Sequence, residues 1–281
     1  MPLSRFMAFG VAWAIVLCLI TTIGAHGDAL EETALAVYEQ HKAAVVTVEL
    51  VVRQRFAFMG MDSESEESRT ETTGTVIDAT GLTVVSLSAT DPTSMMTNLM
   101  GGMLGDDMQI QSEIADVRII ADGPPIPASI LLRDKDHDLA FVRPLAPVDP
   151  PLPFIDLNQS AQPSLLEALV VIQRMGRVAN RVHAVSLSRV KAVVERPRRF
   201  YLADTDAIGA PALRLDGRCA GIFVTRVIKS PHGGAGFPMN LLSEIQDTMS
   251  IILTPAATIL EGAAQAPPVV AGDDASSIKP E

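Results

Sequence analysis

The sequence predicts an all-β fold, either a barrel or a sandwich. Short runs of β-branched and other apolar residues recur along most of the 281-residue chain, and turn residues separate one run from the next. Many short strands at this spacing, with no helices between them, are typical of all-β domains. Because 48% of the residues are hydrophobic, the chain can bury a substantial core.

The N-terminal segment has the pattern of an export signal. Arg5 precedes an apolar run from residue 6 to residue 23, and small residues around His26 suit a cut before Asp28. We therefore expect residues 1–27 to be a signal peptide and the protein to be extracytoplasmic, either periplasmic or secreted. The apolar run approaches the roughly 20 residues of a membrane helix, so an uncleaved N-terminal anchor stays open.

An amphipathic helix is expected over residues 28–42, where Glu31 and Glu32 near its start complement the helix dipole. Strands are expected from there to residue 227. Their predicted ranges are Ala43–Val52, Gly74–Asp78, Leu82–Leu87, Asp116–Ile120, Ala128–Leu132, Leu139–Val142, Leu169–Gln173, Val182–Val194, Ala212–Leu215 and Ala220–Val227.

Three other stretches interrupt this pattern. The segment Met59–Glu71 is rich in Asp, Glu and Ser and is therefore predicted to be a solvated acidic loop; it lacks the turn glycine and ligand spacing of a calcium loop. Residues 91–115 form a Met-rich insertion. The stretch Leu241–Leu253 is predicted to be a C-terminal helix that Pro255 ends, and residues 254–281 to be a disordered tail.

Five segments occur in an order and spacing that point to one family. They are the strand Ala43–Val48, the glycine-bracketed hairpin Gly74–Val84, the Asp-Leu-Ala strand His137–Val142, the turn and hairpin Thr205–Arg218, and Gly234–Asn240. Together they resemble the protease domain of the HtrA/Deg family of trypsin-like serine proteases. The resemblance implies a double six-stranded β-barrel over residues 28–253, with an N-terminal and a C-terminal helix. We expect no PDZ-type peptide-binding domain after Leu253.

The resemblance also locates a catalytic site, and the sequence departs from the family there. Asp138 matches the triad aspartate, whereas the histidine position falls on Ser88 and the nucleophile position on Ile208. A serine hydrolase needs a hydroxyl nucleophile, an imidazole base and a carboxylate that orients the base. Ile208 has no nucleophilic atom, and Ser88 cannot act as a base near neutral pH. Without an imidazole to orient, Asp138 is expected to cap the turn before its strand.

The turn around the nucleophile position is altered as well. In the family this turn supplies the backbone N–H groups that stabilise an oxyanion. Ala207 and Ala210 stand on either side of Gly209 where the family uses Asn and Gly, so we expect a degenerate oxyanion turn.

The leading functional hypothesis is a non-catalytic pseudoprotease that binds peptides, unfolded chains or active relatives, and that forms homo-oligomers if it follows its family. No cofactor or metal is expected. With a net charge of −11 and no basic face, nucleic acid is an unsuitable partner. Cys219 is expected to be a buried structural thiol.

Two alternatives stay open. The first is an active serine endopeptidase with displaced residues, in which Ser86 or Ser88 works with His183 or His232. The second is Cu(I) handling by thioethers of the Met-rich insertion, although the same residues also suit an apolar packing face. These methionines are Met95, Met96, Met100, Met103 and Met108.

Overall fold

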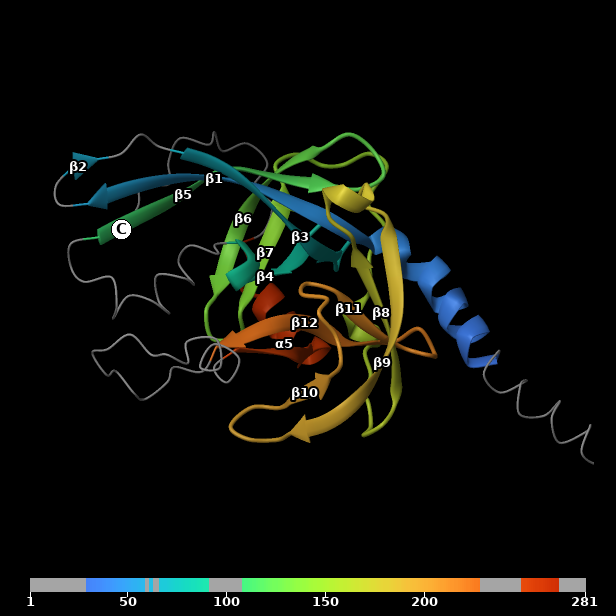
Figure 1. Cartoon of the computed structure of the whole chain (residues 1–281). Helices are drawn as coiled ribbons and strands as arrows, with labels where there is room; N and C mark the ends of the chain where they lie inside the picture. Colours follow the sequence, from blue (N-terminus) through green and yellow to red (C-terminus); the bar gives the residue numbers. More distant parts are fainter. Residues whose placement is uncertain (1–28, 59–60, 63–65, 91–107, 228–248, 268–281) are drawn as a thin grey trace, which may run out of the picture.

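The computed structural model describes residues 29–58, 61–62, 66–90, 108–227 and 249–267, and they form two antiparallel β-barrels (Figure 1). The first barrel contains β1 (Val45–Phe58), β3 (Glu66–Val76), β4 (Thr83–Ser86), β5 (Met108–Ile120), β6 (Ile126–Asp134) and β7 (Leu139–Pro144), and the short β2 (Met61–Asp62) pairs with the end of β1. The second contains β8 (Ala168–Arg174), β9 (His183–Val194), β10 (Phe200–Ala203), β11 (Pro211–Arg214), β12 (Cys219–Val227) and β13 (Met249–Pro255).

Each barrel closes on itself through backbone pairing. The first runs β1-β3-β4-β7-β6-β5 and returns to β1 through the β1–β5 ladder, while the second closes in the order β10-β13-β12-β11-β8-β9. Two six-stranded antiparallel barrels make a trypsin-like fold, so the predicted fold class is confirmed.

Alternation along the strands divides the apolar side chains among three cores. In β8, Leu169 and Val171 point into the second barrel, whereas Val170 and Ile172 join a core that contains residues of both barrels. The interior of the first barrel is separate and includes Val46. A period of two residues places successive side chains on opposite faces of a strand, which is why the same strand serves two cores.

Helices cover the join between the barrels. A helix over residues 29–41 leads through the 3-10 turn η1 (Lys42–Ala44) into β1, and it buries Ala34 and Val37 in the shared core. At the other end of the described chain, α5 (Ala256–Ala263) buries Ile259 in the same core. The remaining short helical turns are α2 (Leu87–Thr90), η2 (Leu157–Gln159) and η3 (Arg177–Ala179).

The C-terminal helix is present, but its predicted position is wrong. Residues 249–253, expected to be helical, belong to β13, which pairs with β12 from Val227 opposite Met249 to Gly221 opposite Pro255 and completes the second barrel. The helix follows Pro255 instead of ending there. Proline suits the start of a helix because its fixed φ is compatible and its missing N–H has no helical partner to lose. The expected tail is therefore ordered through α5, and residues 268–281 lie outside the described ranges.

The prediction of an acidic loop over Met59–Glu71 is also partly wrong. Residues 66–71 continue β3 and pair with β1, from Gln54 opposite Glu66 to Glu49 opposite Glu71. The strand is long because β1 offers a partner along its whole length, and the charge run alone gave no sign of that pairing. All ten predicted strands occur with shifted ends, and the short strands β2 and β10 were not predicted.

Candidate functional site

Asp138 ends the turn before β7, and the N–H groups of this turn donate to the carboxylate of Asp134. Asp134 Oδ1 accepts the backbone N–H groups of Asp136 at 2.9 Å and His137 at 3.1 Å. Asp138 has a left-handed backbone with φ of 55°, a conformation that aspartate adopts more readily than most residues. The turn-capping role expected of Asp138 thus belongs to Asp134, and the Asp138 carboxylate reaches the end of β4 instead.

Hydrogen bonds from both barrels engage both oxygens of the Asp138 carboxylate. Oδ1 accepts the backbone N–H of Ser88 at 2.7 Å, and Oδ2 accepts the Ser88 hydroxyl at 3.1 Å and the backbone N–H of Thr225 at 3.0 Å. The Ser86 hydroxyl also donates to Oδ2. Burial raises the pKa of Asp138 above its ordinary value, although these hydrogen bonds oppose the shift. Hydroxyl and amide groups therefore fill the acceptor positions that a triad imidazole would need.

The histidines of the described ranges make no hydrogen bond to Asp138. His137, its neighbour in sequence, is held between its own turn and Arg198, whose guanidinium lies 3.0 Å from the ring Nε2. His183 Nε2 lies 3.0 Å from a backbone carbonyl of β1. Of the two bases weighed for a displaced site, His183 is thus engaged elsewhere, and His232 lies outside the described residues.

Three consecutive backbone N–H groups around Ile208 donate hydrogen bonds within the protein. The Ile208 N–H donates to the carbonyl of Asp206 at 3.1 Å, and the Ala207 N–H donates to the Thr205 hydroxyl at 3.0 Å. The Gly209 N–H donates to a backbone carbonyl of β12 at 2.7 Å. Oxyanion stabilisation needs N–H groups aimed at a reacting carbonyl, and these three are consumed within the protein.

Gly209 fits where no side chain could. Its φ is 80°, and an added Cβ would lie 2.0 Å from the carbonyl oxygen of Thr73. The Gly209 carbonyl in turn accepts the Thr75 hydroxyl at 3.0 Å. Ala207 is 2% and Ala210 0% exposed, so these two residues of the turn are buried beside β3 of the first barrel, whereas Ile208 is partly exposed.

A cleft of about 260 Å³ opens beside this turn, between the two barrels. Thr47 lines it, is only 2% exposed, and has a hydroxyl with no hydrogen-bond partner among the described residues. The other lining residues combine apolar and polar groups. They are Glu71, Thr72, Thr73, Ala89, Gln173, Arg174, Met175, Gly176, Asp206 and Ile208.

Ion pairs hold one wall of the cleft in place. Arg177, in η3, donates to Glu71 at 2.7 Å and to Glu49 at 2.8 Å, and Arg181 donates to Glu71 at 2.5 Å. Burial alone would raise the pKa of Glu71, but the hydrogen bonds and charges of the two arginines outweigh it and lower the pKa. This cluster was not expected from the sequence, because Glu71 fell in the predicted acidic loop and only Glu49 in a predicted strand.

Several predicted features lie away from this site. Met95, Met96, Met100 and Met103 fall outside the described residues, and Met108 begins β5. Cys219 is buried, and burial raises the pKa of its thiol to about 12, as befits a structural residue. In the ranges that the structure describes, no three His, Cys, Asp or Glu side chains gather as a metal site, and no helix is long and apolar enough to cross a membrane.

Comparison with known proteins gives a likeness in structure alone. No protein-family model and no curated protein sequence matches the chain. Among solved structures, it is similar to the protease domain of MamO from Magnetospirillum magneticum in its apo form, with 13% sequence identity and a TM-score of 0.48. The match covers 80% of this chain and 97% of that one. At this identity and score it assigns no activity, ligand or partner to the present protein.

Proposed function

We propose that this trypsin-like domain is non-catalytic and binds an extended segment of another protein in the cleft beside Ile208. The observation that carries the proposal is Ile208 itself, which puts a hydrocarbon side chain where the family resemblance expects the nucleophile, at the edge of a cleft that stays open. The bonding of the Asp138 carboxylate agrees with the proposal, because this acid is held by hydroxyl and amide donors and orients no imidazole among the described residues.

The cleft lining suits a peptide. Ala89, Met175 and Ile208 offer apolar contact for a side chain, while the unpartnered Thr47 hydroxyl and the Gln173 amide offer hydrogen bonds to a backbone. Binding sites of this kind combine apolar walls with a few placed polar groups. Filling the hydroxyl's missing hydrogen bond would relieve the cost of a buried unpaired group, about 1–3 kcal/mol.

We propose the cellular setting from the sequence. The export pattern of residues 1–27 supports an extracytoplasmic location. Unfolded chains, peptides or active relatives are the proposed partners, and assembly with further copies of the chain is compatible with the family resemblance.

Fluorescent, unfolded casein tests binding and cleavage in one assay. We expect saturable binding by fluorescence anisotropy and no release of small fragments. Ile208→Arg should weaken binding about tenfold or more, because a bulky charge would enter the cleft at a cost of about 1.4 kcal/mol or above. The matched control is Val178→Arg in the neighbouring η3, where the native side chain is fully exposed and lines no part of the cleft. Equal affinities for the two variants would contradict binding in the cleft, and casein fragments would contradict the non-catalytic assignment.

A further inference from the structure

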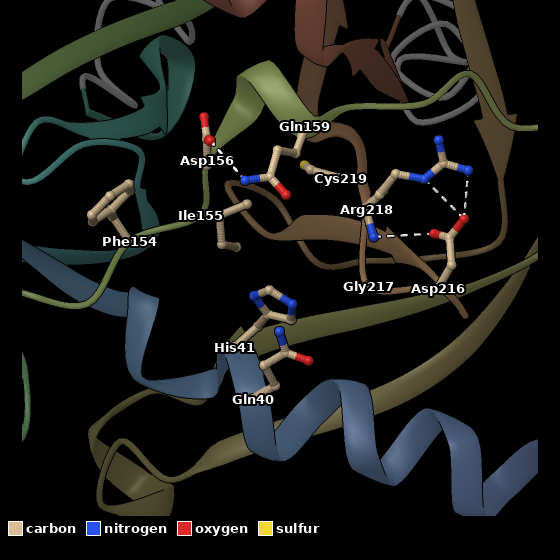
Figure 2. A pocket seen from close by; sticks show the side chains of 10 residues that line it. All are labelled: Gln40, His41, Phe154, Ile155, Asp156, Gln159, Asp216, Gly217, Arg218 and Cys219. Atoms are coloured by element: carbon tan, nitrogen blue, oxygen red, sulfur yellow. Dashed lines mark hydrogen bonds and ion pairs between the residues drawn. The ribbon is translucent and has the colours of Figure 1, made fainter.

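A second cavity, which we call the helix-end pocket, has a volume of about 340 Å³ and lies where the helix 29–41 ends against the second barrel (Figure 2). Its lining comes from that helix, from the segment leading into η2 and from the β11–β12 hairpin. The lining residues are Gln40, His41, Phe154, Ile155, Asp156, Gln159, Asp216, Gly217, Arg218 and Cys219. None of them lines the cleft beside Ile208, so a ligand of the helix-end pocket would bind independently of the function proposed above.

The His41 side chain brings an unsatisfied polar atom to this pocket. Its Nε2 is buried and has no hydrogen-bond partner among the described residues. Burial lowers the pKa of His41, so the ring is neutral at neutral pH and repels no cation. With its proton on Nδ1, a neutral imidazole presents a lone pair on Nε2, which accepts a hydrogen bond.

Other groups around the pocket are acceptors too. The Gln159 amide nitrogen donates to Asp156 at 3.1 Å, and in Figure 2 the amide oxygen of Gln159 faces the His41 side. Asp156 accepts hydrogen bonds from the Asn158 backbone and side chain at 3.0 and 2.9 Å. These bonds lower the pKa of Asp156, which is therefore ionised at neutral pH.

The charges leave the pocket negative. Arg218 is the cation of the lining, and it is bound to Asp216 at 2.7 and 2.9 Å, which neutralises it (Figure 2). Asp156 has amide donors but no cationic partner in the described part of the chain. At the rim, the Phe154 ring is 44% exposed and can face a bound cation.

We propose that the helix-end pocket binds a cationic nitrogen group, the guanidinium or alkylammonium of a basic peptide side chain or of a small polyamine. Such a group brings several N–H donors and no acceptor, which complements the acceptors of His41, Gln159 and Asp156. Its positive charge would lie near the Asp156 carboxylate, which has no cationic partner in the described residues. Gln159 of η2 and His41 of the helix 29–41 would fix its position by accepting hydrogen bonds.

Nuclear magnetic resonance of the histidine rings tests the proposal in the full chain. The probes are N-acetyl-arginine amide for a peptide side chain, putrescine for a polyamine, and N-acetyl-glutamine amide as the uncharged match. We expect the cationic probes to shift the His41 ring nitrogens saturably, and the uncharged probe to bind about two- to fivefold more weakly, as for an exposed ion pair. The His183 ring, which contacts β1, should not respond. Tighter binding of the arginine amide would identify a peptide side chain as the source, and tighter putrescine binding a polyamine.

The Asp156→Asn variant distinguishes cation binding in the helix-end pocket from attraction of cations to the net negative charge of the protein. Asparagine caps a helical turn as well as aspartate does, so η2 should stay folded while cation affinity falls about two- to fivefold. The matched control is Asp136→Asn, since Asp136 is an exposed aspartate outside the pocket. The proposal is overturned if the two variants bind alike, if the uncharged probe binds as tightly as the cations, or if no probe shifts the His41 ring.

Discussion

The Asp138 cluster and the cleft beside Ile208 are neighbours with opposite hydrogen-bonding states. Ser88 is bonded to the Asp138 carboxylate, and the next residue, Ala89, lines the cleft. In the cluster, hydroxyl and amide donors from two barrels satisfy the carboxylate, whereas in the cleft the buried Thr47 hydroxyl has no partner among the described residues. The proposed function rests on this difference between a hydrogen-bonded carboxylate and an adjacent open cleft.

Gly209→Ala should have the largest effect on this contrast, because it disrupts the turn around Ile208. A Cβ at this position combines a φ of 80° with a backbone oxygen 2.0 Å away, so we expect a loss of about 3 kcal/mol or more in unfolding free energy by urea denaturation. Gly217→Ala is the control. Its φ is 81°, but its Cβ would meet only side-chain atoms, His41 Nε2 at 3.4 Å and Gln40 Oε1 at 3.9 Å, and the expected loss is about 1 kcal/mol. Equal losses would mean that the Gly209 turn is loosely packed.

Glu71→Gln should have the next largest effect, because it weakens the wall of the cleft. Two arginines lose a charged acceptor, and we expect a loss of about 2 kcal/mol. The folded-state pKa of Glu71 lies below its unfolded value. Its contribution is therefore present above about pH 4.3 and lost as pH falls through the folded-state pKa. Urea denaturation across pH should show the difference from the native protein shrinking in acid.

Glu195→Gln is the control for Glu71→Gln. Glu195 pairs with Arg199 on the surface, where solvent screens the pair and its contribution to stability is small. A loss at Glu71 no larger than that at Glu195 would show that the ion pairs do not hold the cleft wall.

Asp138→Asn should have a smaller effect, about 1 kcal/mol, since asparagine keeps one acceptor and tolerates a φ of 55°. Here the folded-state pKa is raised. The native carboxyl therefore contributes most below its unfolded pKa of about 3.9, and that contribution is lost as pH rises through the folded-state pKa. In the native protein this loss makes the free energy of unfolding fall as pH rises through that range, and the Asp138→Asn variant should lack the fall. An unchanged pH dependence of the unfolding free energy would show that a group other than Asp138 causes it.

Ile208→Ser should have the smallest effect. It restores a hydroxyl, but the backbone N–H of residue 208 is bonded to Asp206, and no histidine of the described ranges reaches Asp138. We expect casein cleavage to stay at background. Measurable cleavage would show that the site lacks only its nucleophile.

The barrels could be predicted because strand alternation and turn residues are local signals. Residues 249–253 were misread as helical because their apolar residues fit either a helix or a strand, and the pairing of β13 with distant β12 decides between them. Similarly, nothing local showed that Pro255 starts a helix instead of ending one.

The residues of the candidate site could be predicted from the sequence, but their hydrogen-bond partners could not. Family spacing singled out Asp138, Ser88 and Ile208, and the structure places Ser88 against Asp138. The Thr225 amide that completes the carboxylate network was not predictable, because a backbone N–H carries no residue-type signal. The helix-end pocket was missed for a related reason, since three distant segments assemble around His41.

Labelling with a broad-reactivity fluorophosphonate tests the central claim most directly. The protein lacking residues 1–27 would be treated with the probe beside an active trypsin-like protease, and any labelled residue located by peptide mass spectrometry. The account predicts no labelling above the heat-denatured control, because no serine hydroxyl in the described ranges is hydrogen-bonded to a histidine. Stoichiometric labelling of Ser86 or Ser88 would contradict it and establish a displaced catalytic site.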